Sequence, residues 1–174
     1  LLALFCGLRK GEIAGLKFGD FDVETRTIYI QRQITSNPVV SKGGSEIQSY
    51  EVIEKPPKTD NSYRKLRIPE AIAEEIEKRR AVVEANKLQY GEQYFDHDYI
   101  SCQENGLPHS MAAMNGVLTR LCARNGLPHI TVHGLRHMYA TILIEMKVPL
   151  IKISALLRHA SVNTTFEYYC EVMD

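Results

Sequence analysis

The chain has 174 residues, of which 44% are hydrophobic and 24% are charged, as is typical of a folded globular domain. This composition excludes collagenous and intrinsically disordered chains, and no apolar run reaches the roughly 20 residues that a membrane-spanning helix needs. The 21 Lys and Arg residues cancel the 21 Asp and Glu residues. Because proteins that coat nucleic acids are usually basic, this balance argues at first against a nucleic-acid partner.

The first half of the chain predicts short helices followed by strands. Residues 1–16 read as a helix end, a turn at Gly7 and a short helix. Three extended stretches follow at residues 27–34, 46–54 and 63–68, separated by turn-rich segments. Their short connections predict one three-stranded antiparallel sheet at the edge of the domain.

The second half of the chain predicts helices. They cover about residues 69–90, 110–124, 131–146 and 149–157, and a last one begins near Val162. Pro69 and Pro149 suit helix starts, and Ser110 and Thr131 suit N-caps. The expected fold class is therefore α+β and mainly helical, in one domain over residues 1–174.

The cysteines and the first residues bear on localisation. The four cysteines are scattered and lack the short spacings of a zinc site, so we expect reduced thiols in a cytoplasm. The chain starts inside an apolar helical pattern, LLALFC, with no charged leader. We therefore expect a piece of a longer cytoplasmic protein.

The charge is sorted along the chain, although its total is zero. Residues 55–67 hold five bases and one acid, a net of +4, and residues 116–158 hold six bases and one acid, a net of +5. Residues 68–98 hold four bases and eight acids, a net of −4. This pattern suits a protein with one anion-binding face and one acidic face, although charge runs are often only solvated helix surfaces.

The stretch TVHGLRHMYATILIEM, residues 131–146, carries the densest group of polar candidates. Helical periodicity places His133, Arg136 and His137 on one edge, with a predicted core stripe of Leu135, Tyr139, Ile142 and Met146 on the opposite side. Because this edge lies in the first turns of a helix, it suits an anion such as phosphate. A solvated helix start remains an alternative, as does a metal site at His133 and His137, which Arg136 disfavours.

Three further places carry residues with two possible interpretations each. Arg9 follows a glycine turn and stands three residues before Glu12, so it suits a phosphate ligand or an ordinary ion pair. Lys58 lies between two predicted strands and is either solvated or a proton donor. The stretch LLRHASVNTTFEYYCEVMD contains two adjacent tyrosines, which by default are core or amphipathic surface residues. A nucleophilic tyrosine needs nearby cations that stabilise its phenolate.

Taken together, four motifs in this order resemble the catalytic domain of the tyrosine recombinases, the phage integrase family. They are GLRKGEIAGLKFGDFD, KTDNSYRKLRIP, HGLRHMYAT and LLRHASVNTTFEYY. The resemblance implies site-specific DNA recombination or integration through a 3′-phosphotyrosine intermediate, without metal or cofactor. It implies a phage or other mobile element as the source, double-stranded DNA as partner, and a tetramer on two DNA sites. We expect this fragment to be a monomer without a membrane partner, the N-terminal core-binding domain being absent.

The resemblance also implies roles for individual residues. Arg9, Arg136 and His159 would bind the phosphate oxygens, while Lys58 would protonate the leaving oxygen and His133 would accept the tyrosine proton. The remaining roles fall to Tyr169 as nucleophile, Tyr168 as alternative nucleophile, Glu12 as support for Arg9, and Arg64, Lys65 and Arg158 as DNA-binding residues.

The sequence departs from the family pattern at two places. Arg158 replaces the glycine that normally precedes the histidine, and Glu171 stands where a histidine is common. Two other functions use a similar residue set: type IB topoisomerase-like relaxation of DNA, and DNA binding by a non-catalytic regulator of the same fold. The GLRxxE and HxLRH spacings fit the topoisomerase-like enzymes less closely, and competent residues at all six matched polar positions count against the regulator, so we favour the recombinase.

Overall fold

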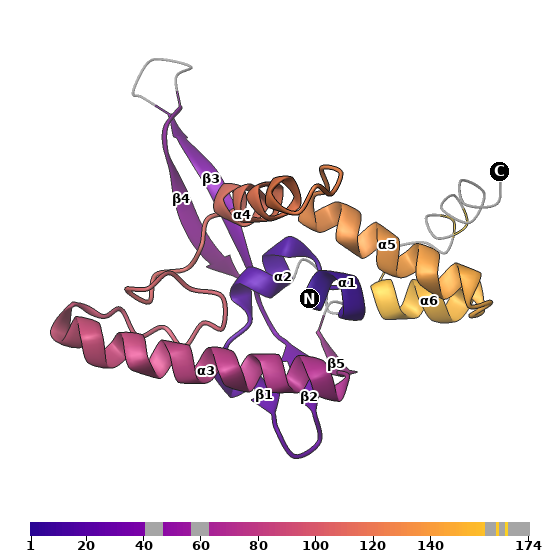
Figure 1. The fold of residues 1–174 in the computed structure, drawn as a ribbon, viewed down its shortest axis with the longest axis horizontal. Helices are drawn as coiled ribbons and strands as arrows, with labels where there is room; N and C mark the ends of the chain where they lie inside the picture. The colour runs from indigo at the N-terminus through magenta and orange to yellow at the C-terminus, as the bar shows by residue number, and fades with distance from the viewer. Residues whose placement is uncertain (41–46, 57–62, 159–162, 164–165, 167–174) are drawn as a thin grey trace. The chain divides into compact units, whose positions relative to one another are not determined.

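The computed structural model describes residues 1–40, 47–56 and 63–158, together with residues 163 and 166 (Figure 1). The chain divides into two compact units, one formed by residues 1–10 and the chain from 117 onward, the other by residues 11–116. Within the described ranges, no helix is long and apolar enough to cross a membrane. Most of the helix predicted from Val162 lies outside the described residues. Asn163 and Phe166, the described residues of this segment, are helical.

The first unit is built from α1 (Leu2–Cys6), α5 (Val132–Glu145) and α6 (Leu150–Leu157). Helices α5 and α6 lie side by side (Figure 1), and they share a core of Ala140, Ile144, Ile153 and Leu157. Thr131 caps α5 as predicted, because its side-chain oxygen accepts the Gly134 N–H at 3.0 Å. The predicted start of α6 at Pro149 is also confirmed.

The described part of the second unit contains α3 (Glu70–Tyr90) and the short 3₁₀ helices η1 (Phe18–Asp20) and η3 (Gly91–Gln93). Helices α2 (Lys10–Gly15) and α4 (Met111–Arg124) run across the boundary between the units. Pro69 occupies the N-cap of α3, and the Ser110 hydroxyl accepts the Ala113 N–H at 3.1 Å at the start of α4. The predicted helices at residues 69–90 and 110–124 are therefore confirmed.

The strands form two small antiparallel sheets where the sequence predicts one. Strand β2 (Thr27–Ile30) lies between β1 (Phe21–Asp22) and β5 (Arg64–Arg67), with Ile28 opposite Phe21 and Leu66. Strands β3 (Gln33–Val40) and β4 (Ile47–Lys55) pair with each other and with no other strand of the described ranges. The predicted strand 27–34 is thus divided between two sheets, and the stretch 46–54 does not join the three-stranded one.

Side chains at the division between β2 and β3 give the physical reason. Gln31 and Arg32 are consecutive, yet both donate to the carboxylate of Asp20. Neighbouring residues of a regular strand point to opposite faces, so one acceptor cannot bind both while the strand continues. The chain therefore leaves the first sheet here and begins the second at Gln33.

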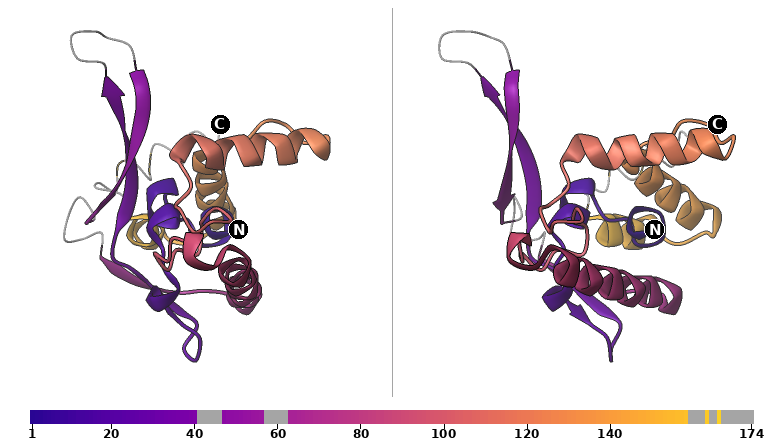
Figure 2. Two further views of the ribbon diagram at one scale, coloured as in Figure 1. Left: turned by 90° about the vertical axis from the view of Figure 1, so that its left-hand side faces the viewer. Right: turned by 60° about the vertical axis from the view of Figure 1, so that its left-hand side comes forward.

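Helix α3 lies beside the β1–β2–β5 sheet in both views of Figure 2. Its buried side chains include Ile72, Ile76 and Val83, which follow the helical spacing that the sequence predicts. The Arg80 guanidinium lies 4.5 Å from the centre of the Phe18 ring, and Arg79 donates to the carbonyl oxygens of Ile100 and Cys102, so basic residues of this acidic helix also pack inward.

Candidate active site

The described candidate residues fall into both units. Arg9, His133, Arg136 and Arg158 belong to the first unit, whereas Glu12, Arg64 and Lys65 belong to the second. Four further candidates lie outside the described residues: Lys58, His159, Tyr168 and Tyr169.

Arg136 is buried at the centre of the first unit, with 3% of its surface exposed. Its two terminal nitrogens donate to the carbonyl oxygens of Gly7 and Leu157. Gly7 is the C-cap of α1 and Leu157 is the last residue of α6. Carbonyls at helix C-termini lack partners within the helix and carry partial negative charge, so a buried cation is stabilised between them.

Gly7 is needed for this arrangement. Its backbone is left-handed, with φ of 64°, and a Cβ added there would lie 2.7 Å from a ring carbon of Tyr139 and 2.9 Å from a methyl carbon of Leu157. Glycine alone adopts this conformation without strain and leaves room for both neighbours. The turn predicted at Gly7 therefore also delivers a carbonyl oxygen to Arg136.

The buried face of α5 differs from the predicted one. Val132, Arg136, Ala140 and Ile144 are buried, each four residues after the last. In contrast, Ile142 is 42% exposed and Met146 is 69% exposed, although both were expected in the core stripe. The prediction was wrong for these two residues, whereas Tyr139 packs against the core cluster as expected. Arg136 lies on the buried face instead, because carbonyl partners allow its charge to be buried.

Arg9 lies between α1 and α2 and reaches the same end of α6. One of its terminal nitrogens donates to the carbonyl oxygen of Arg158 at 2.7 Å. Consecutive carbonyls, at Leu157 and Arg158, thus bind the two predicted phosphate-binding arginines. This arrangement brings Arg9 and Arg136 together at the residue that precedes His159 in the sequence.

Arg158 ends α6 in a left-handed conformation, with φ of 51° and ψ of 51°. Its N–H caps the helix by donating to the carbonyl of Ala155. Glycine is the usual residue at such a position, because a Cβ is crowded by the following carbonyl oxygen. Arg158 nevertheless adopts the conformation that glycine favours, and its side chain is exposed.

His133 stands exposed in the first turn of α5, with its ring centre 4.2 Å from that of His137 in an edge-to-face arrangement. The pKa of His133 lies below its ordinary value, first because the ring is partly desolvated and then because it faces several cationic groups, which are His137, Arg136, Arg9 and Lys10. The neutral imidazole that a general base requires is therefore favoured. Among the described residues, no group of three metal-ligating side chains is present.

Glu12 and Arg64 form a buried ion pair in the second unit. The Arg64 terminal nitrogens donate to the two Glu12 carboxylate oxygens at 2.7 and 3.0 Å, and both side chains are less than 7% exposed. The prediction that Arg64 contacts DNA is not supported, because its fork is turned inward onto a carboxylate. A basic run in the sequence does not show which of its members are paired in the fold.

Lys65, the neighbour of Arg64, keeps the exposure that a DNA contact needs. It is exposed on β5, and its ammonium lies 5.4 Å from the centre of the Tyr29 ring across the sheet. The alternation of strand side chains places these two adjacent bases on opposite faces, one inward and one outward.

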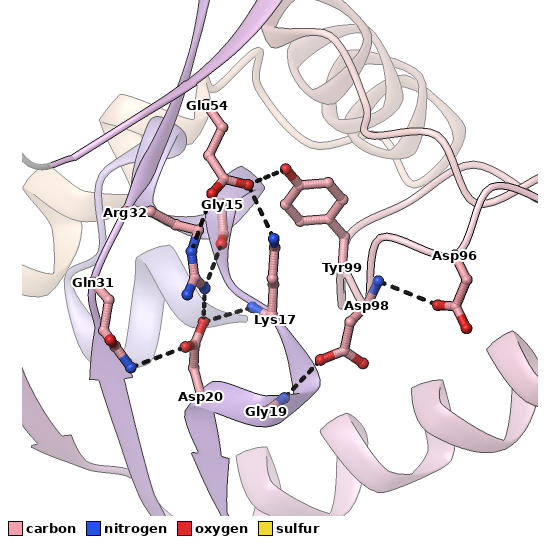
Figure 3. A network of polar contacts seen from close by, with 10 residues as sticks. All are labelled: Gly15, Lys17, Gly19, Asp20, Gln31, Arg32, Glu54, Asp96, Asp98 and Tyr99. Atoms are coloured by element: carbon pink, nitrogen blue, oxygen red, sulfur yellow. Dashed lines mark hydrogen bonds and ion pairs between the residues drawn. The ribbon is translucent and has the colours of Figure 1, made fainter.

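A second network, drawn in Figure 3, was not predicted from the sequence. Arg32 bridges the carboxylates of Asp20 and Glu54, and Glu54 also accepts hydrogen bonds from Tyr99 and Lys17. Burial opposes ionisation of Glu54, but these donors outweigh it and lower its pKa. The network joins β4 to η1 and to the segment after α3. The sequence offered two signals, the charged residues Arg32 and Glu54 in otherwise strand-like stretches.

Comparison with known proteins finds relatives that are named as recombinases, integrases or transposases. A family model described as "Phage integrase family" matches residues 1–174. The chain is 33% identical to a "Tyrosine recombinase XerC-like" protein of Caldanaerobacter subterraneus subsp. tengcongensis, over 99% of this chain and 44% of the relative. It is 27% identical to the transposase of transposon Tn916 from Enterococcus faecalis, over 97% of this chain and 40% of that protein.

Solved structures agree on the fold. The Tn1549 transposon integrase in complex with transposon right end DNA matches with a TM-score of 0.75 at 22% identity, over 97% of this chain and 52% of that one. XerA recombinase matches with a TM-score of 0.68 at 20% identity, over 97% and 48% of the two chains. The present chain spans less than half the length of the two curated relatives named above.

Proposed function

The chain belongs to the phage integrase family, and from this premise we propose that its protein breaks and rejoins DNA by site-specific recombination. In this reaction a tyrosine oxygen attacks a phosphodiester, the bond to the 5′-oxygen breaks, and a 3′-phosphotyrosine forms with a free 5′-hydroxyl. The bond exchange is reversible without an external energy source. The reaction class requires no metal, since arginine and histidine side chains supply the positive charge.

The observation that carries the proposal is the meeting of Arg9, Arg136 and His133 in the first unit. Arg9 and Arg136 donate to consecutive carbonyls at the end of α6, and the pKa of His133 is lowered partly by these two arginines. Held cations of this kind stabilise charge that grows on non-bridging phosphate oxygens, and removing one such group typically slows reaction about 10²–10³-fold.

The remaining steps are assigned to residues by the family motifs. We assign nucleophilic attack to Tyr169, with Tyr168 as the alternative, and proton acceptance from it to His133. His159 joins the two arginines on the phosphate, and Lys58 donates a proton to the departing 5′-oxygen. We assign Glu12 to the support of Arg9, and Lys65 and Arg158 to contacts with the DNA backbone.

The proposed partner is double-stranded DNA, bound by four subunits on two recombination sites. The names of the solved relatives, several of them complexes with transposon DNA, support a DNA partner. A source in a phage or other mobile element is supported by the integrase of Staphylococcus phage L54a, 28% identical, and by the Tn916 transposase.

Capture of the covalent intermediate tests the reaction directly. The complete protein is mixed with a nicked duplex that contains its recombination site and loses a short 5′-hydroxyl fragment after cleavage, which prevents rejoining. We expect a protein–DNA adduct from the unaltered protein and from Tyr168→Phe, and none from Tyr169→Phe, because phenylalanine lacks the attacking oxygen. Peptide mapping of the adduct identifies the linked residue.

Each other outcome of this experiment selects an alternative. Loss of the adduct only in Tyr168→Phe would exchange the two tyrosines. Absence of any adduct despite specific DNA binding would indicate a non-catalytic regulator. Relaxation of supercoiled DNA without strand exchange between two sites would indicate a topoisomerase-like enzyme.

The pH dependence of adduct formation tests the assignment of His133. Because the pKa of His133 is lowered from 6.5 and the neutral ring is the base, the single-turnover rate should fall only as pH drops through a midpoint below 6.5. His133→Gln should slow the reaction about 10²-fold or more and remove this acidic limb. His129 is exposed, and His129→Gln serves as the control that should keep the fall in rate at acidic pH. If this fall persisted in His133→Gln, another group would be the base.

A further inference from the structure

The end of α6 holds both described arginines of the candidate site through backbone oxygens. Leu157, the last helical residue, accepts from Arg136, and Arg158, the C-cap, accepts from Arg9 at 2.7 Å. The two acceptors are adjacent in the sequence, so the two arginines meet consecutive carbonyl oxygens of one chain turn. The family motif gives the residue types at these positions, whereas the hydrogen bond from Arg9 to the Arg158 carbonyl is seen only in the structure.

We propose that Arg158 is a positioning residue, whose left-handed backbone turns its carbonyl oxygen toward Arg9 and thereby sets the guanidinium for the scissile phosphate. The proposal rests on the proposed DNA strand cleavage and deepens it. It assigns the effect to the backbone of Arg158, separately from any contact that its exposed side chain makes with DNA.

The physical argument begins with the conformation. In a continuing right-handed helix, the carbonyl of residue 158 would point along the helix axis like those before it. At φ 51° and ψ 51° the chain ends the helix, and the Arg158 N–H donates back to Ala155 while its carbonyl oxygen is turned to Arg9. An L-residue with a Cβ disfavours this conformation, a β-branched residue most strongly, whereas glycine and asparagine accept it.

Four substitutions separate the backbone from the charge. Arg158→Gly, Arg158→Asn, Arg158→Ala and Arg158→Val all remove the guanidinium, so DNA affinity should fall to a similar extent in each. At saturating DNA, the single-turnover cleavage rate should instead follow the preference for the left-handed conformation. We expect the glycine and asparagine variants to cleave about tenfold faster than the valine variant, with alanine between them.

Lys147 provides a matched control. It follows Met146, the C-cap of α5, also with a positive φ of 58°, and its N–H donates to the carbonyl of Ile144 at 2.8 Å. Lys147→Gly and Lys147→Val therefore create the same conformational contrast at another helix end of the same unit. We expect them to differ in thermal stability and to cleave at one common rate.

A substrate with an uncharged scissile linkage distinguishes an effect on the position of Arg9 from a smaller amount of folded protein. When a methylphosphonate replaces the scissile phosphate, less negative charge develops for Arg9 to stabilise, so its exact placement matters less. The rate difference between Arg158→Gly and Arg158→Val should then shrink several-fold. If the valine variant were only partly folded, the same difference would persist on both substrates.

The outcomes are distinct. Equal cleavage rates in all four Arg158 variants, with an active unaltered protein, would overturn the positioning role and leave the proposed reaction standing. A difference that remains the same on the methylphosphonate would also overturn it. If the unaltered protein forms no covalent adduct, the proposed reaction fails and this role fails with it.

Discussion

Replacement of Glu12 by glutamine is expected to lower the free energy of unfolding by about 3–5 kcal/mol, because it leaves the buried Arg64 guanidinium without a counter-charge. Both side chains are almost fully buried and joined by two hydrogen bonds. The Arg64 Nε atom is buried and has no hydrogen-bond partner among the described residues, so the Glu12 carboxylate is the acceptor that these residues offer this guanidinium. Urea unfolding followed by circular dichroism measures the change.

Two comparisons show whether burial is the cause. Glu70→Gln breaks the Arg26–Glu70 pair of the same unit, which has a distance of 3.1 Å but is largely exposed, and should change stability by about 1 kcal/mol or less. The double replacement Glu12→Leu with Arg64→Met should recover much of the loss, because neither charge then remains buried. A Glu12→Gln protein as stable as the unaltered one would contradict the importance of the pair.

Replacement of Arg136 by methionine is expected to reduce adduct formation at least about 10²–10³-fold and to destabilise the first unit. The side chain is of similar length and fits a buried position, but it cannot donate to the carbonyls of Gly7 and Leu157. Loss of these charge-assisted bonds should lower the free energy of unfolding by about 2–5 kcal/mol. Rate and stability must therefore be measured on the same preparation.

Arg120→Met is the matched control for this prediction. Arg120 is an exposed residue of α4, so the same substitution should leave both the cleavage rate and the unfolding free energy within experimental error. Arg136→Lys keeps the charge but loses the planar fork, and should retain part of the stability and little of the rate. An Arg136→Met protein of unaltered stability would show that the two carbonyls find other donors.

The zero net charge takes on a different meaning in the structure. The acidic segment is mostly α3, whose charged residues are exposed or paired within the second unit, for example Lys78 with Glu75 and Arg80 with Glu77. Among the described bases of the two basic segments, Arg64 and Arg136 are buried, and the others, such as Lys65 and Arg158, are exposed. Because the whole chain has no net charge and two of these cations are buried, we expect binding by this part of the protein to DNA to be weak and sensitive to salt.

Local signals predicted the helices well. Proline at helix starts, side-chain caps at Ser110 and Thr131, and the glycine turn after α1 each depend on contacts within a few residues, which sequence spacing records. The strands were found individually for the same reason. Their assignment to one sheet was wrong, because the turn of Arg32 toward Asp20 and Glu54 depends on partners distant in the chain.

By itself, the sequence determined the fold class, the helix boundaries and, through its four motifs, the family and the residues to consider for the reaction. Only the tertiary structure decided which charges are buried and what binds them. Arg64 turns to Glu12, Arg136 to the ends of two helices, and Arg9 to the carbonyl of Arg158. Partners of this kind lie between 21 and 149 residues apart, and several are backbone oxygens, which every residue carries and which no sequence pattern can distinguish.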